Sequence, residues 1–449
     1  NTTVFGCSCS GVQLLQSRAP LSVSRNLSVF STAFLCGLGK DSGNVAGNSD
    51  FLDLGNYLVS IFVLHRLSSD LIFVSGRQQL ASGNIQNNQP IPFYQIEESR
   101  SHNMKAIVLQ ELNRDAKGMD LFDSLVTTDV PYPEPGENEV TVKVMASALN
   151  HRDLWIVRGL YAGIKPPIIL GSDGAGVVDK VGSRVDAGLV GSAVIINPSL
   201  RFGDNPRVQG KEFSILGLPE DGTQAEYVRV PAENIFAKPD FLSFEQAAAL
   251  PLAGITGYRA LFTQGKLESG QVVVISGIGG GVSSLMLAMA VGRGAKVYVT
   301  SSSDEKISAA MAAGAIAGVN YHSEDWVKQL QALTESDGID LVVDSAGGDG
   351  FASLLDCLTP GGRLTFFGAT RGFPSSIDLR KMFFKQITIQ GTTMGNNADF
   401  ANMMDLVNTL QMQPRIDGPT SIKDIRQAYN KMHTGDQFGK LVLTHDSWN

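Results

Sequence analysis

Cysteine is scarce in this chain of 449 residues, and its distribution is uneven. Three of the four cysteines lie within the first 36 residues, which leaves Cys357 as the single thiol of the rest of the chain. A framework of disulfides needs pairs of cysteines throughout the folded body, so this distribution excludes one and suits a reducing compartment.

Long apolar runs and positive charge are also in short supply. A transmembrane helix requires roughly 20 consecutive apolar residues, and the nearest candidate, residues 58–64, is stopped by His65 and Arg66. The 36 lysines and arginines face 44 acidic residues, which gives a net charge of −8. Binding to nucleic acid needs clustered lysine and arginine, and no such cluster occurs. We therefore expect a soluble, cytoplasmic protein with no membrane span and no nucleic acid as its partner.

Residues 1–103 differ in composition from the rest of the chain. They are rich in serine, asparagine and glycine, and Asp41 is the only acidic residue up to Ser49. The first methionine, Met104, directly precedes the strand-like run KAIVLQE. We therefore place a boundary at Met104 and interpret residues 1–103 either as a disordered extension, absent from the mature protein, or as a plastid or mitochondrial targeting segment.

Residues 271–300 carry the clearest local pattern in the chain. Val272 to Ser276 is a β-branched apolar run, typical of a strand buried on both faces of a parallel sheet, and the pattern then predicts a helix over 282–291 and a second strand over 295–300. Glycines between the strand and the helix let the backbone approach a pyrophosphate, whose charge is met by the N–H groups of the helix N-terminus. The predicted dinucleotide contacts are Gly277, Gly279, Gly280, Gly281 and Val282.

The end of the second strand indicates which dinucleotide binds. An NAD site usually carries Asp or Glu there, about 20 residues after the glycines, to hold the ribose hydroxyls. Here residues 300–303 are neutral, and Lys306 follows them. Hydroxyl groups and a cation suit a 2′-phosphate, which a carboxylate would repel. The pattern favours NADPH over NADH, although a solvated helix start is the alternative interpretation.

Short strand-like segments with glycine and proline turns precede this unit. They span residues 106–109, 139–146, 173–182 and 188–197. Many short strands separated by such turns predict a partly open β-barrel. We therefore expect a second domain, placed ahead of the α/β cofactor domain.

Four motifs occur in the order that is typical of medium-chain dehydrogenases/reductases. They are NHRDLW at 150–155, GSDGAGVVDKVG at 171–182, AAALPLAGITGYRAL at 247–261 and VVVISGIGGGV at 272–282. The span 104–449 resembles that superfamily, and within it the zinc-free quinone oxidoreductase branch, whose relatives include the zeta-crystallins. The resemblance implies a GroES-like catalytic domain at 104–254, a Rossmann domain with a doubly wound parallel sheet at 255–391, and a segment at 392–449 that returns to the first domain.

The resemblance also bears on the chemistry. Zinc members of the superfamily bind the metal through cysteine and histidine, but the matching positions here hold Asn150, Ser172 and Leu252, none of which is a plausible zinc ligand. We therefore expect no metal. Without a Lewis acid the expected reaction is hydride transfer to an acceptor that is already electrophilic, such as a quinone or an α,β-unsaturated carbonyl (an enal).

Further site residues follow from the same resemblance. Tyr161 is a candidate for polarising the substrate carbonyl or relaying its proton, because a phenol is both donor and acceptor. Asp153 is either a residue of the site or a structural carboxylate. The catalytic residues implied are Asn150, Asp153, Tyr161 and Thr256. The further cofactor residues implied are Ser302, Lys306, Tyr321, Gly368 and Lys440.

The resemblance favours a homodimer or homotetramer. Two other functions stay open at this point. One is an NADPH-binding protein with little turnover, used as a sensor or a structural partner. The other is an alcohol dehydrogenase-like activity on an unknown substrate.

Overall fold

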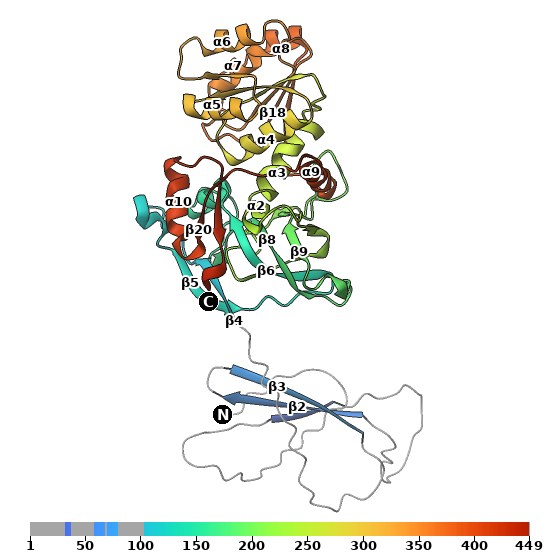
Figure 1. Cartoon of the computed structure of the whole chain (residues 1–449). Coiled ribbons are helices and arrows are strands. Elements are labelled where there is room, and N and C mark those ends of the chain that lie inside the picture. The colour runs from blue at the N-terminus through green and yellow to red at the C-terminus, as the bar shows by residue number, and fades with distance from the viewer. Residues whose placement is uncertain (1–31, 37–57, 68–69, 80–102, 449) are drawn as a thin grey trace, which may run out of the picture. The chain divides into compact units, whose positions relative to one another are not determined.

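The computed structural model describes residues 32–36, 58–67, 70–79 and 103–448, which belong to two compact units that are described one at a time (Figure 1). The first unit contains an antiparallel sheet in the order β1-β2-β3, formed by β1 (Thr32–Cys36), β2 (Leu58–Leu67) and β3 (Asp70–Gln79). The rest of residues 1–103, for which we predict a disordered or targeting role, lies outside the described residues apart from Asn103. The second unit holds all the predicted site residues.

The second unit begins with short antiparallel strands. A three-stranded sheet has the order β5-β4-β7, and a seven-stranded sheet has the order β13-β9-β8-β6-β21-β20, with β12 also paired to β6. Their bounds are β4 (Asn103–Leu109), β5 (Leu125–Pro131), β6 (Glu139–Ala148), β7 (Ile168–Ile169), β8 (Asp173–Val181), β9 (Ala193–Ile196), β12 (Tyr227–Pro231), β13 (Ile235–Ala237), β20 (Ile416–Ser421) and β21 (Lys440–Thr444). Val140, Val142 and Val144 of β6 are buried, as their alternation predicts.

The strand predicted over 188–197 is correct only in its second half. The strand β9 begins at Ala193, because residues 187–189 form a 3-10 turn instead. The Asp186 carboxylate accepts a hydrogen bond from the Gly188 N–H at 3.0 Å, and Gly191 has a φ of 85°. A capped turn followed by a left-handed glycine cannot continue a pleated strand.

The next part of the chain forms a parallel sheet in the order β16-β15-β14-β17-β18-β19. Its strands are β14 (Val272–Ile275), β15 (Lys296–Ser301), β16 (Ala317–Asn320), β17 (Leu341–Asp344), β18 (Arg363–Phe366) and β19 (Thr388–Gly391), and the connecting helices are α4 (Gly281–Gly292), α5 (Asp304–Ala312), α6 (Trp326–Leu333), α7 (Gly350–Cys357) and α8 (Leu379–Lys385). Val273 and Val272 of β14 belong to two different apolar cores, so both faces of the sheet are covered. The predicted doubly wound α/β sheet is confirmed. Chain order reverses on either side of β14, which makes its carboxyl end the switch point of the sheet.

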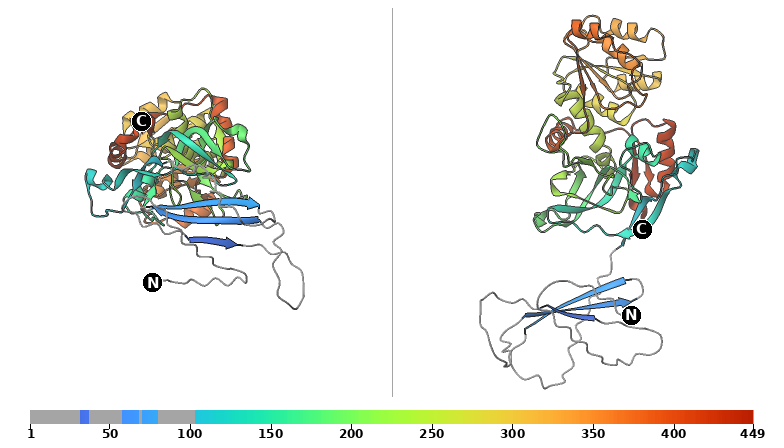
Figure 2. Two further views of the ribbon diagram at one scale, coloured as in Figure 1. Left: turned by 90° about the horizontal axis from the view of Figure 1, so that it is seen from below. Right: turned by 180° about the vertical axis from the view of Figure 1, so that it is seen from behind.

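After this sheet the chain returns to the antiparallel strands. The helix α9 (Asn397–Leu410) packs against α3 (Pro251–Tyr258), and β21 pairs with β6. The view from behind in Figure 2 shows this red C-terminal segment beside the blue-green strands. The helix α10 (Ile425–Thr434) completes the apolar core around Phe122 and Tyr429. Among the helices of the described ranges, none combines the length and the apolarity that crossing a bilayer would require.

A buried ion pair fixes the junction between these parts. The Arg259 guanidinium, directly after α3, donates to the Asp399 carboxylate of α9 at 2.6 Å and to the carbonyl of Pro206 at 2.7 Å. Thr263 Oγ1 donates to the same carboxylate at 2.6 Å. Arg259 is 2% exposed, so its charge depends on this partner. The pair therefore links α3, α9 and the loop that contains Pro206.

We predict that Asp399→Asn lowers the free energy of unfolding by about 3–5 kcal/mol, because it leaves the buried Arg259 charge without a counter-ion. The measurement is urea unfolding of the variant and the parent protein. Glu137→Gln is the control: it breaks an exposed pair with Arg184 and should cost no more than about 1 kcal/mol. Equal losses for the two variants would contradict the role given to Asp399.

Candidate functional site

The turn between β14 and α4 is contacted by two lysine side chains. Gly279 has a φ of 116°, and a Cβ atom placed on it would lie 2.6 Å from Cδ of Lys306. A Cβ atom on Gly281 would likewise lie 2.6 Å from Cδ of Lys440. Glycine is therefore needed at both positions for the lysines to lie against the turn. Gly277, Gly280 and Val282 belong to the same turn and the start of α4.

Three of the predicted cofactor residues gather at the ends of β15 and β16. Ser301 and Asn320 are partners in the register of these strands, and the Tyr321 N–H donates to the Ser301 carbonyl at 3.0 Å. Ser302 and Tyr321 thus follow two adjacent strand ends. The N–H of Lys306 donates to the side chain of Ser303, the N-cap of α5, which places Lys306 in the first helical turn beside them.

The acidic residues next to Lys306 are engaged elsewhere. Asp304 accepts a hydrogen bond from Asn320 Nδ2 at 2.9 Å, and Glu305 accepts one from Ser303 Oγ at 2.5 Å. Within the described part of the chain, the Lys306 ammonium has no ion pair with a carboxylate. The strand end therefore presents an uncompensated cation with neutral hydroxyl groups beside it.

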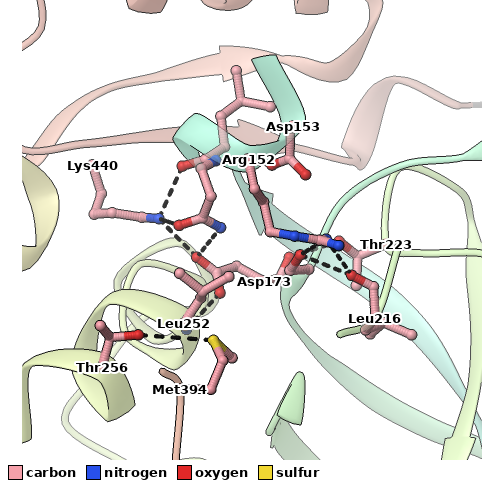
Figure 3. A network of polar contacts seen from close by, with 12 residues as sticks. Arg152, Asp153, Asp173, Leu216, Thr223, Leu252, Thr256, Met394 and Lys440 are labelled. Atoms are coloured by element: carbon pink, nitrogen blue, oxygen red, sulfur yellow. Dashed lines mark hydrogen bonds and ion pairs between the residues drawn. The ribbon is translucent and has the colours of Figure 1, made fainter. Parts of the chain in front are cut away.

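The ammonium group of Lys440 lies at the centre of a buried polar network (Figure 3). It donates to the Leu149 carbonyl at 2.9 Å, to Asn150 Oδ1 at 2.8 Å and to Asp173 Oδ2 at 2.7 Å. Asn150 Nδ2 donates to the same Asp173 oxygen at 2.9 Å, and the Leu252 N–H donates to the other at 2.7 Å. All three ammonium hydrogens have acceptors, so the network fixes the Asn150 amide in one orientation.

A second buried cation lies nearby, on α1 (His151–Val157). Arg152 Nη1 donates to Ser172 Oγ at 2.7 Å and to the Leu216 carbonyl at 2.9 Å. The Arg152 guanidinium carbon also lies 5.3 Å from the centroid of the Tyr161 ring. Tyr161 is 37% exposed, and it is held by this cation rather than joined to the Lys440 network.

Asp153 belongs to the first turn of α1 and is fully buried. Its Oδ2 accepts a hydrogen bond from the Asn150 N–H at 2.8 Å and so caps the helix, while its Oδ1 has no hydrogen-bond partner in the described structure. Burial raises the pKa of the Asp153 carboxyl to about 6, against the lowering effect of the Arg152 charge. Asp153 therefore has the contacts of a structural carboxylate that supports Asn150.

The other predicted residues are placed as follows. Thr256 lies in α3, and its Oγ1 is 3.8 Å from the sulfur of Met394. Gly368 follows β18, where an added Cβ atom would lie 2.7 Å from the Ser345 carbonyl oxygen. The structure thus brings together Asn150 with Lys440, and Lys306 with the glycine turn. Asp153 contacts the Lys440 network only through the backbone N–H of Asn150, and Tyr161 contacts Arg152 instead.

Two charged residues of the site have no role in the sequence prediction. Both lie inside quoted motifs: Asp173 stands among small and apolar residues, and Arg152 stands between His151 and Asp153. A charge in such a setting is a signal, because a buried charge requires a partner. Their partners are distant in the sequence, however, and only the fold identifies them.

Comparison with known proteins places these features in a family. Residues 136–240 match the alcohol dehydrogenase GroES-like domain, and residues 281–409 match the zinc-binding dehydrogenase family. The zinc-type alcohol dehydrogenase-like protein YogA of Leptosphaeria maculans is 35% identical over 352 residues, which cover 74% of this chain and 97% of that protein. The chain belongs to the medium-chain dehydrogenase/reductase superfamily. It is an oxidoreductase of that superfamily, and the predicted GroES-like domain is confirmed.

Other members of the superfamily carry different names. A quinone oxidoreductase of Pseudomonas aeruginosa is 31% identical over 272 residues, which cover 60% of this chain and 78% of that protein. The crystal structure of an NAD-dependent alcohol dehydrogenase matches with a TM-score of 0.71 and 33% identity, over 76% of this chain and 100% of that one. These matches establish the superfamily, but the matched proteins are named for different substrates and cofactors.

Zinc is the metal that the superfamily implies, and the residues present do not fit it. The positions that match the ligands hold an amide, a hydroxyl and an aliphatic side chain, namely Asn150, Ser172 and Leu252. The Lys440 ammonium and the Arg152 guanidinium occupy hydrogen-bonding sites on Asn150 and Ser172. A divalent cation there would be repelled by both buried charges. In the described ranges, no group of three or more His, Cys, Asp or Glu side chains is arranged to hold a metal ion.

The raised pKa of Asp153 predicts a dependence of stability on pH. The folded-state pKa of about 6 lies above the ordinary aspartate pKa of 3.8. The carboxyl therefore stabilises the fold fully below the lower pKa and loses that contribution as the pH rises through the higher one. Replacing it by Asn keeps an oxygen acceptor for the Asn150 N–H. The free energy of unfolding of Asp153→Asn minus that of the parent protein should therefore increase by about 2–3 kcal/mol as the pH rises from about 4 to about 7.

The measurement for Asp153 is urea unfolding of both proteins at several pH values. Glu137→Gln serves as the control, since Glu137 is exposed in a surface pair and its replacement should leave the shape of the pH profile unchanged. Parallel profiles for Asp153→Asn and the parent would contradict the assignment.

Proposed function

We propose that this protein is a zinc-independent reductase that transfers a hydride from NADPH to a quinone or an α,β-unsaturated carbonyl. The observation that carries the proposal is the pair of buried cations, Lys440 and Arg152, on the side chains that match the zinc ligands. Without a Lewis acid an alcohol is poorly activated, whereas a conjugated acceptor is already electrophilic. In this proposal residues 104–254 and 392–449 form the catalytic part, and residues 255–391 bind the cofactor.

The cofactor part of the proposal depends on the strand end after β15. NADPH, when bound, supplies the hydride. The turn at Gly277–Gly281 suits a pyrophosphate because α4 begins there, and the first N–H groups of a helix have no partner within the helix. Ser302, Lys306 and Tyr321 suit the 2′-phosphate, since Lys306 has no carboxylate partner among the described residues and Asp304 and Glu305 are bonded elsewhere.

The acceptor part depends on residues that hold or supply a proton. Reduction of a quinone or an enal consumes the hydride and one proton, and the phenol of Tyr161, partly exposed, is the proposed donor. The Asn150 amide uses one N–H hydrogen for Asp173 and has a second for a substrate oxygen or the nicotinamide ribose. Thr256 offers a hydroxyl on the cofactor side. Asp153 acts through Asn150, whose backbone it holds.

The similarity to a quinone oxidoreductase supports this choice of acceptor. Alcohol dehydrogenases are also among the similar proteins, so an alcohol dehydrogenase-like activity is the second candidate function. An NADPH-binding protein with little turnover is the third possibility from the sequence. These alternatives differ in what they do with the reduced cofactor, so a panel of acceptors separates them.

The first experiment measures cofactor choice. We predict a higher kcat/KM with NADPH than with NADH, and a loss of about tenfold or more with NADPH in Lys306→Gln, with a change of no more than about twofold with NADH. Lys328→Gln, an exposed lysine of α6, is the matched control and should behave as the parent. A kcat/KM with NADH that equals or exceeds that with NADPH would show this interpretation of Lys306 to be wrong.

The second experiment tests acceptor class and metal together. We predict that the purified protein oxidises NADPH with quinones or enals, does not oxidise secondary alcohols, keeps its activity after treatment with a zinc chelator, and contains far less than one zinc ion per chain by elemental analysis. Tight NADPH binding without turnover on any acceptor would favour the binding protein. Stoichiometric zinc with alcohol oxidation would favour the dehydrogenase.

A further inference from the structure

Two loops at the carboxyl edge of the parallel sheet are joined by their backbones. One follows β17 and contains Ala346, Gly347 and Gly348, and the other follows β18 and contains Arg371 and Gly372. The Arg371 N–H donates to the Ala346 carbonyl at 2.8 Å, and the Gly348 N–H donates to the Gly372 carbonyl at 2.9 Å. This reciprocal pair of bonds fixes the backbone of Arg371 against the neighbouring loop.

The contact requires glycine on the β17 side. Gly347 and Gly348 have φ values of 67° and 64°, and a Cβ atom on Gly347 would lie 2.5 Å from the Gly372 carbonyl oxygen. A side chain at Gly347 would therefore separate the loops. The two glycines make room for the segment that carries Arg371.

The Arg371 side chain then extends along the sheet edge to Tyr321. Its guanidinium carbon lies 5.2 Å from the centroid of the Tyr321 ring. Tyr321 follows β16 and Arg371 follows β18, and the strands β15, β14 and β17 lie between these two in the sheet. The side chain thus reaches the group formed by Ser302, Lys306 and Tyr321 from the far side of the switch point.

Arg371 is exposed and carries no ion pair or side-chain hydrogen bond within the part of the chain that the structure describes. An exposed arginine without a partner ordinarily samples many rotamers. Here the backbone is fixed by the loop contact, and the aromatic ring holds the guanidinium by a cation–π interaction. The result is a planar, charged group over the Tyr321 ring, with no side-chain hydrogen bond to the described residues.

We propose that Arg371 is a second cation for the 2′-phosphate of the cofactor and a determinant of the preference for NADPH. The inference rests on the proposed function, because it assumes the phosphorylated dinucleotide. A guanidinium can donate two parallel hydrogen bonds to a phosphate, whereas Lys306 offers a point charge. The pyrophosphate is assigned to the glycine turn after β14, so the anion nearest the Tyr321 ring is the 2′-phosphate.

The test is equilibrium binding to the full chain by calorimetry, with adenosine 2′,5′-bisphosphate and with 5′-AMP as probes. The parent should prefer the bisphosphate. Arg371→Gln should bind the bisphosphate about tenfold more weakly, and 5′-AMP within about twofold of the parent. Arg371→Lys should recover part of the lost affinity for the bisphosphate, because lysine restores the positive charge but not the two parallel N–H donors of the guanidinium. Arg380→Gln, in α8 beside Asp378, is the matched control and should bind both probes as the parent does.

The outcomes separate the two proposals. A parent protein that does not distinguish the probes would overturn the proposed NADPH preference and, with it, the role of Arg371. A parent that prefers the bisphosphate, together with an unchanged Arg371→Gln variant, would overturn only the role of Arg371. Equal losses for both probes would show that Arg371 supports the adenine ring rather than the phosphate, which also overturns the assignment. Retained 5′-AMP binding shows that the variant is folded.

Discussion

The ion pair between Lys440 and Asp173 is the interaction on which the site depends. Removing two charges from water costs several kcal/mol for each ion, and only good geometry with further hydrogen bonds offsets that cost. Here the ammonium has three acceptors, and the carboxylate also accepts from the Asn150 amide and the Leu252 N–H. These bonds join β21, β8, the start of α1 and the start of α3. The same lysine stem lies against Gly281, so the pair also sets the position of the catalytic part relative to the glycine turn.

The second cation gives the site its electrostatic character. Arg152 and Lys440 are fixed positive charges in a region shielded from water, where electrostatic interactions are stronger than at the surface. Fixed charges and dipoles stabilise negative charge that develops on a reacting group, as a metal ion does, but without a coordination bond to the substrate oxygen. The difference between the two arrangements is that protein cations cannot lower the pKa of an alcohol by coordination.

The sequence could predict what depends on local pattern. The β-branched run at Val272, the glycines after it and the neutral strand end at 300–303 are short-range signals, and the parallel sheet around β14 agrees with them. The prediction of a strand over 188–197 is wrong in its first half, because residues 187–189 form a turn that is capped by Asp186. The partners of Arg152, Asp173 and Arg371 could not be predicted, since each contact joins segments that only the fold brings together. The resemblance to a family indicated Lys440 and Asn150, but it did not indicate that they bond to each other.

Asp173 and Lys440 are separated by 267 positions, and the whole parallel sheet is encoded between them. During synthesis the carboxylate of β8 emerges long before its counter-ion, so the antiparallel part of the molecule cannot reach its final state until the cofactor-binding part has also left the ribosome. A contact of such long range slows folding and prolongs the exposure of apolar surface. The carboxylate of β8 is consequently without its counter-ion until the last strand, β21, has been made.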